Sequence, residues 1–199
     1  MNEHGEHVGC GRCAAGAGAG AREPFAFPGT SRKYARDRVV DVRHVRLDVA
    51  VDPALRRIEG TARHTVAAIA DGTERLVLDA AELTVTGVAD GDGKPLAFEH
   101  VDGALTIRFA RRLAAGQTTD VVIAYHGAPR RGLYFIAPDE AYPDKPVQAW
   151  TQGQDEDARF WFPCFDYPNE KASVEVVVTS PSKYTTLSNG ALVGKTPGP

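Results

Sequence analysis

Apolar and polar residues alternate with a period of two over much of this 199-residue chain, and this alternation restricts the folds open to it. Between positions 45 and 51 every odd residue is Val or Leu, and residues 57–66 form a second run of the same period. Such a period is typical of a strand with one face on a core, so the two runs are predicted to be neighbouring antiparallel strands. Val40 and Val42 alternate in the opposite phase, which indicates a bulge or twist near His44.

Asp-Gly pairs divide the following part of the chain into short apolar runs. They occur at 71–72, within 90–93 and at 102–103, and Asp-Gly between alternating runs is the strongest short-range signal for a β-hairpin. Further runs at 119–127 and 173–180 have strand character, whereas no long stretch has the apolar stripe of a helix. The 20 Gly and 13 Pro residues agree with a turn-rich protein. The predicted fold class is therefore all-β, an antiparallel β-sandwich.

Charge and hydropathy exclude several classes of partner. The 23 basic and 26 acidic residues are interleaved and give a net charge of −3, so the basic excess of a nucleic-acid-binding protein is missing. No window has enough consecutive apolar residues for a membrane-spanning helix, and the first nine residues are too polar for a secretory signal. We therefore expect a cytoplasmic protein without nucleic-acid or membrane partners.

Residues 1–37 are predicted to be a disordered Gly/Ala-rich tail, because they offer too little apolar surface to offset the entropy of ordering. The folded β domain is expected to span 38–199. Within the tail, four residues with zinc-ligating side chains recur at every third position. Since such ligands usually come as two separated pairs on a scaffold, adventitious metal binding is favoured over a structural site. The four residues are His4, His7, Cys10 and Cys13.

The alternation stops between positions 127 and 172, where aromatic residues crowd together with amides and charged groups. Irregular chain on a β scaffold is where binding groups usually lie. An aromatic plug of the core, with Arg159 and Asp166 paired to each other, fits the same residues and is the favoured interpretation for them. The acidic run 155–157 is interpreted as a solvated turn, with attraction of an amino terminus as the alternative.

The string QGQDEDARFWFPCFDYPNEKA, residues 152–172, resembles the signature in the amino-terminal domain of the aminopeptidase N family of zinc peptidases, which includes leukotriene hydrolase. The family pattern is Gln-x-Glu or Gln-x-Gln, then Ala-Arg, then Phe-Pro-Cys-x-Asp-x-Pro and Lys-Ala. The segment RGLYF at 131–135 also resembles the family, and the resemblance covers residues 34–195. The matching positions are Gln152, Gln154, Ala158, Arg159, Phe162, Pro163, Cys164, Asp166, Pro168, Lys171 and Ala172.

This resemblance implies a saddle-shaped antiparallel β domain that leans on a thermolysin-like catalytic domain. It also implies that the loop with Gln152 and Gln154 reaches into the active site. There Gln154 would help to hold the free α-amine of a peptide substrate, and Gln152 would line the same pocket. Arg159 and Asp166 carry over only as scaffold that shapes the loop. The implied function is substrate recognition and docking in a zinc-dependent aminopeptidase, and the choice between the peptidase and hydrolase branches stays open.

The catalytic signatures of that family do not occur in this sequence. It contains neither His-Glu-x-x-His nor Gly-x-Met-Glu-Asn, and no two of its six histidines lie four positions apart. We therefore expect no metal site and no catalytic residue in this chain, which alone would be inert, with zinc held by an absent catalytic domain. The end at GKTPGP is interpreted as a truncation. His64 and Cys164 are interpreted as buried core residues.

Two other functions fit the same sequence. A noncatalytic protein-interaction module derived from the same family would keep the domain and lack peptidase function. A His-Glu-x-x-His motif in the gene beyond residue 199 would discriminate between the two. A free-standing carbohydrate- or protein-binding β-sandwich is disfavoured, because it gives no reason for the match at 152–172.

Overall fold

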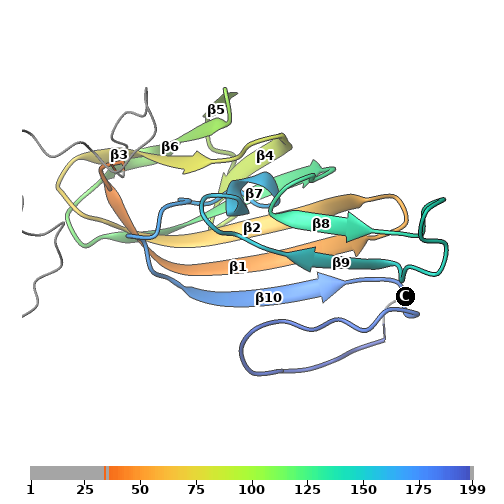
Figure 1. Ribbon diagram of the computed structural model, residues 1–199. Coiled ribbons are helices and arrows are strands. Elements are labelled where there is room, and N and C mark those ends of the chain that lie inside the picture. The colour runs from red at the N-terminus through yellow and green to blue at the C-terminus, as the bar shows by residue number, and fades with distance from the viewer. Residues whose placement is uncertain (1–33, 35, 198–199) are drawn as a thin grey trace, which may run out of the picture. The chain divides into compact units, whose positions relative to one another are not determined.

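The computed structural model describes residue 34 and residues 36–197, and Figure 1 shows them as a ribbon. These residues form strands and one turn of 3-10 helix, with no α-helix among them, which confirms the predicted all-β class. They contain no helix with the length and hydropathy needed to cross a membrane. The elements are β1 (Val40–Asp52), β2 (Arg57–Ala68), β3 (Thr73–Asp79), β4 (Leu83–Asp90), β5 (Phe98–Val101), β6 (Ala104–Leu113), β7 (Thr118–Gly127), β8 (Leu133–Ile136), β9 (Gln148–Thr151), η1 (Ala158–Phe160) and β10 (Ser173–Thr179).

The predicted tail, 1–37, lies almost entirely outside the described residues, and so does the cluster of His and Cys residues at positions 4–13. One described residue of that segment, Arg36, contacts the β domain. Its guanidinium donates to Asp79 Oδ2 at 3.1 Å. The contacts of the domain therefore include a residue that precedes the predicted boundary at 38.

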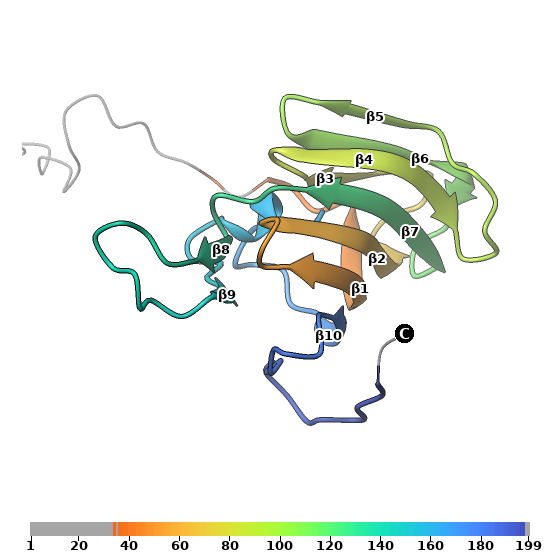
Figure 2. The same cartoon turned by 90° about the vertical axis from the view of Figure 1, so that its right-hand side faces the viewer.

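The strands form three sheets, in the orders β10-β1-β2-β7-β4, β3-β6-β5 and β8-β9. In Figure 2 the three-stranded sheet lies over the β4–β7 end of the five-stranded sheet. Strands β1 and β2 pair antiparallel, and their register shifts between Val42 and His44, which confirms the predicted bulge. The shift has a physical role, because it keeps both Val42 and Val45 buried although they lie three positions apart.

The two larger sheets share one hydrophobic core. Leu47 of β1 and Ile123 of β7 belong to the same buried cluster as Leu78 of β3 and Ile107 of β6. Full burial of such a side chain contributes about 1.5–3 kcal/mol, so this cluster holds the sheets together. His64 of β2 lies in the core with 0% of its surface exposed, as the sequence predicts.

One strand pair differs from the predicted antiparallel arrangement. Strand β10 pairs with β1 in parallel, with His44 opposite Ser173 and Ala50 opposite Thr179. A parallel pair needs a long connection, because the chain must return to the starting end before it can run alongside. Here the chain forms β2 to β9 before it returns, so β10 occupies the edge of β1 that β2 leaves free.

The Asp-Gly pairs serve different purposes. Asp102 and Gly103 have φ angles of 50° and 76° and join β5 to β6 as a two-residue hairpin, with Val101 opposite Ala104. The pair at 71–72 instead connects β2 to β3, which belong to different sheets. The hairpin signal at 71–72 therefore marks a crossing between sheets rather than a hairpin.

Candidate functional site

The loop that carries Gln152 and Gln154 leaves the end of β9 and leads into η1. Strand β9 is held by β8, whose Tyr134 stacks on Trp150 with ring centroids 4.7 Å apart. Both glutamines are exposed, and so are Gly153 between them and Asp155 after them. The structure thus places the two predicted binding residues close together in one exposed loop after β9, and the partner strand β8 is anchored in the core through Leu133.

The two ends of this loop are tied to the chain just before β8. The Gln152 N–H donates to the Gly132 carbonyl at 2.8 Å. At the other end, Asp157 is 9% exposed and its Oδ1 accepts from Arg131 Nη2 at 2.7 Å. The interpretation of 155–157 as a solvated acidic turn is therefore wrong for Asp157, because its carboxylate is withdrawn from water to pair with a cation.

Arg159 of η1 joins the loop to the segment that follows it. Its Nε donates to Asp166 Oδ2 at 3.0 Å, and its backbone N–H donates to the same oxygen at 3.0 Å. Its Nη2 reaches Glu156 Oε2 at 2.9 Å. These bonds confirm the predicted Arg159–Asp166 pair, and they extend it to Glu156 inside the loop.

Asp79, at the end of β3, completes this network, although the sequence patterns did not single it out. Its Oδ2 accepts from the Asp166 N–H at 3.1 Å, its Oδ1 lies 3.7 Å from Arg159 Nη1, and Arg36 binds both oxygens. Its backbone also exchanges hydrogen bonds with Cys164, at 2.7 and 3.0 Å. A carboxylate placed directly after the apolar run LVL was the available signal.

Burial changes the acidity of this network. The pKa of Asp166 is raised, first because its carboxyl loses hydration and further because the Asp79 charge lies close, while the contacts with Arg159 act in the opposite direction.

Arg36 also stacks over Phe165 and Tyr167, with its guanidinium carbon 4.7 and 5.5 Å from the ring centroids. The segment 165–167 is therefore fixed by charge and by aromatic contact together.

Two core residues, His64 and Cys164, are shielded from solvent. His64 Nε2–H donates to the Pro163 carbonyl at 2.9 Å, and loss of hydration lowers the pKa of the ring to about 4. Burial likewise raises the pKa of the Cys164 thiol well above its usual value. A neutral thiol inside the core is a poor nucleophile and a poor ligand, so the interpretation of both residues as core is confirmed.

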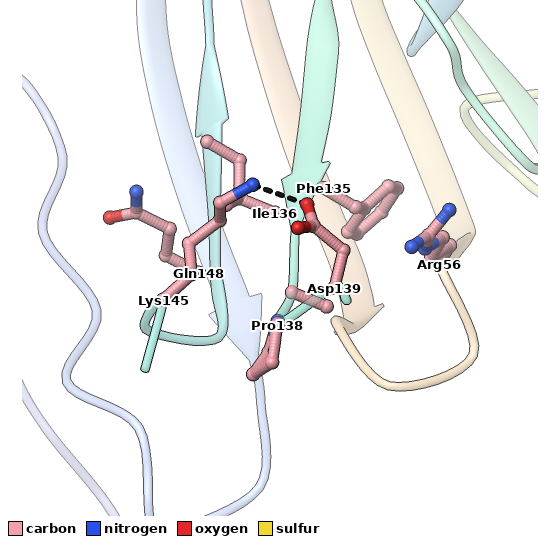
Figure 3. A pocket seen from close by; sticks show the side chains of 8 residues that line it. Arg56, Phe135, Ile136, Pro138, Asp139, Lys145 and Gln148 are labelled. Atoms are coloured by element: carbon pink, nitrogen blue, oxygen red, sulfur yellow. Dashed lines mark hydrogen bonds and ion pairs between the residues drawn. The ribbon is translucent and has the colours of Figure 1, made fainter. Parts of the chain in front are cut away.

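A surface hollow of about 380 Å³ lies at the opposite end of the β8–β9 hairpin. Figure 3 shows Phe135, Gln148 and the ion pair of Lys145 with Asp139 around it, and that pair closes at 2.6 Å. Neither Gln152 nor Gln154 lines the hollow. The candidate site is therefore the exposed loop and not this depression.

A family model for the peptidase M1 N-terminal domain matches residues 40–197. The chain belongs to this family. The resemblance of 152–172 to the amino-terminal domain of aminopeptidases is thereby confirmed, and the β-sheets described above are those of a peptidase M1 N-terminal domain.

This peptidase M1 N-terminal domain is similar to parts of larger proteins. Aminopeptidase B of Mus musculus is 25% identical over 173 residues, which are 75% of this chain and 27% of that protein. Aminopeptidase M1-A of Oryza sativa subsp. japonica is 35% identical over 133 residues, which are 61% of this chain and 15% of that protein. The chain thus spans less than a third of the length of these relatives.

Solved structures share the fold. An M1 zinc metallopeptidase from Deinococcus radiodurans, solved with a Tyr-Ser-Ala substrate, matches with a TM-score of 0.66 over 80% of this chain and 37% of that chain. The sequences are 23% identical over the match, so this likeness concerns the fold.

The zinc of such metallopeptidases does not fit the described residues of this domain. Among residues 34 and 36–197, no three His, Cys, Asp or Glu side chains gather closely enough to hold a metal ion. The most buried histidine, His64, already uses Nε2 for Pro163.

Proposed function

We propose that this chain is the substrate-recognition and docking domain of a zinc-dependent aminopeptidase, which removes amino-terminal residues from peptides. In this proposal Gln154 binds the α-amine of the peptide and Gln152 lines the same pocket. A thermolysin-like catalytic domain outside these residues holds the zinc and supplies the hydrolytic chemistry. The observation that carries the proposal is the exposed Gln152–Gln154 loop, held at both ends within a chain of the peptidase M1 N-terminal domain family.

The residue types of the loop suit an ammonium group. The side-chain oxygen of Gln154 accepts hydrogen bonds, and a hydrogen bond to a charged group contributes about 1.5–3 kcal/mol. The neighbouring Asp155 is exposed and adds negative charge without forming an ion pair among the described residues. No proton transfer is required of these residues, so the loop selects and orients the substrate while the reaction occurs elsewhere.

Substitution of Gln154 tests this role in the intact protein that joins this domain to its catalytic domain. Gln154→Ala should lower kcat/KM for free-amine peptides about tenfold to a hundredfold, because it removes one hydrogen bond to a charged group. Gln154→Glu should raise it modestly, because a carboxylate adds charge attraction. Acetylated peptides, which lack the ammonium charge, should respond little to either change.

Gln148→Ala is the matched control, because Gln148 is an exposed glutamine of β9, the strand before the loop, and lines the separate hollow. It should leave kcat/KM unchanged for both substrates. An equal response of free and acetylated peptides to Gln154→Ala would reduce Gln154 to a scaffold residue. An intact protein that hydrolyses no aminoacyl substrate would reject the aminopeptidase role and favour the interaction module.

A further inference from the structure

We propose that Arg131 and Gly132 form a clamp that positions the Gln152–Gln154 loop, and that Arg131 is a positioning residue for amine recognition. The inference about recognition rests on the proposed function, whereas the clamp itself concerns only contacts of this chain. Neither residue forms a hydrogen bond with the side-chain amide of Gln152 or Gln154. Each instead fixes one end of the six-residue loop that begins at Gln152 and ends at Asp157.

Gly132 holds the first end of the loop through its backbone. Its carbonyl accepts from the Gln152 N–H at 2.8 Å, and its φ of +73° lies in the left-handed region. A Cβ at this position would meet the Asp157 carbonyl oxygen at 1.9 Å and Trp161 at 3.1 Å. The absence of a side chain at Gly132 therefore lets both ends of the loop approach one peptide unit.

Arg131 holds the second end through its side chain. Its Nη2 donates to Asp157 Oδ1 at 2.7 Å, and its guanidinium carbon lies 4.7 Å from the centroid of the Phe160 ring in η1. The planar guanidinium can bind a carboxylate and stack on an aromatic face at the same time, which an ammonium cannot do as well. Arg131 thus fixes the last loop residue to the helix turn that follows.

The Arg131–Asp157 ion pair should affect the position of the loop more than the global stability of the domain. The Arg131 side chain is 59% exposed and the Asp157 side chain is 12% exposed. The guanidinium thus keeps most of its contact with water, and the nearly buried Asp157 carboxylate can regain its hydration by local opening of the loop, so loss of the pair should cost little in global unfolding. Because both loop ends meet adjacent residues, however, loss of one tether releases the segment that carries Gln154 while the sheets stay intact. Local opening of this kind is independent of global unfolding.

The clamp can be tested on the 199-residue chain alone by amide hydrogen exchange. Arg131→Ala should speed exchange of the Gln152 and Asp157 amides about fivefold, and Arg131→Lys should speed it less. The amide of Leu47 in β1 should be unaffected in both variants. Arg130→Ala is the matched control, because Arg130 is the adjacent arginine and pairs with Glu82 instead.

A kinetic experiment on the intact enzyme tests the link to recognition. Arg131→Ala should raise KM for free-amine peptides about fivefold with little change in kcat, and Arg131→Lys should restore part of the loss. The KM for acetylated peptides and the melting temperature of the variant should change little. A general structural defect would instead alter both.

The two experiments distinguish a failure of the clamp from a failure of the proposed role in amine recognition. Unchanged exchange of the Gln152 and Asp157 amides in Arg131→Ala would overturn the clamp, whatever the activity. Faster exchange with an equal loss for free and acetylated peptides would overturn the role of Arg131 in amine recognition and count against Gln154 as the amine ligand. Faster exchange with a loss confined to free-amine peptides is the expected result.

Discussion

Asp79→Ala is expected to lower the free energy of unfolding by about 3 kcal/mol, near the lower end of the range for breaking a buried ion pair. The Asp79 side chain is 9% exposed, and its oxygens accept from Arg36 and from the Asp166 N–H. Its removal leaves these donors without their acceptor. The side chains of Arg36 and Arg159 keep 29% and 20% of their surface in water. The expected loss of stability is therefore near the lower end of that range.

Urea unfolding of the 199-residue chain measures this loss, and Asp79→Asn serves as the companion variant. The amide oxygen of Asn can still accept from the Asp166 N–H, so its loss should be smaller than that of Ala. Asp120→Ala is the control, because Asp120 is partly exposed where it pairs with Arg63 at 3.0 Å and accepts from Thr65 Oγ1 at 2.7 Å. Loss of these partly exposed contacts should cost less, about 1–2 kcal/mol. Equal losses for Asp79→Ala and Asp120→Ala would contradict the central place of Asp79 in the network.

The period-two pattern predicted most strands because the sheets have one buried face. It predicted the bulge near His44 for the same reason, since a change of phase is visible in the order of residues. The partner of each strand is a different matter. Nothing in the run at 173–180 distinguishes parallel pairing with β1 from antiparallel pairing, because both bury the same face. The Asp-Gly pair at 71–72 was ambiguous for a similar reason, since a tight turn can connect two sheets as well as two strands of one sheet.

The site was predictable where its contacts are local. Arg159 and Asp166 lie seven positions apart and the sequence predicted their pairing. Asp79 lies 87 positions from Asp166, and no local pattern connects them. The withdrawal of Asp157 from water depends in the same way on Arg131, which arrives from the preceding strand connection. The roles of Gln152 and Gln154 came from the family resemblance, and they stay predictions.

His64 should make the stability of the domain depend on pH by about 3 kcal/mol between pH 6.5 and pH 4. Its pKa falls from 6.5 to about 4 on folding, because the ring loses all its hydration, although the Pro163 carbonyl acts in the opposite direction. The unfolded chain therefore binds a proton that the folded chain does not, and a tenfold difference in proton affinity between the two states corresponds to about 1.4 kcal/mol. The stability is fully present above pH 6.5, declines as the pH falls, and has lost this contribution near pH 4.

His64→Gln isolates this contribution, because the amide N–H₂ can donate to the Pro163 carbonyl and cannot be protonated in this range. Urea unfolding at a series of pH values should give a shallower decline of stability for this variant than for the parent, by up to about 1.4 kcal/mol per pH unit. His126→Gln is the control, since His126 is exposed in the folded chain and its ring stays in water in both states. That variant should follow the parent curve. Parallel curves for His64→Gln and the parent would mean that the buried ring accepts a proton without unfolding, and would contradict the assignment of His64 as a neutral core residue.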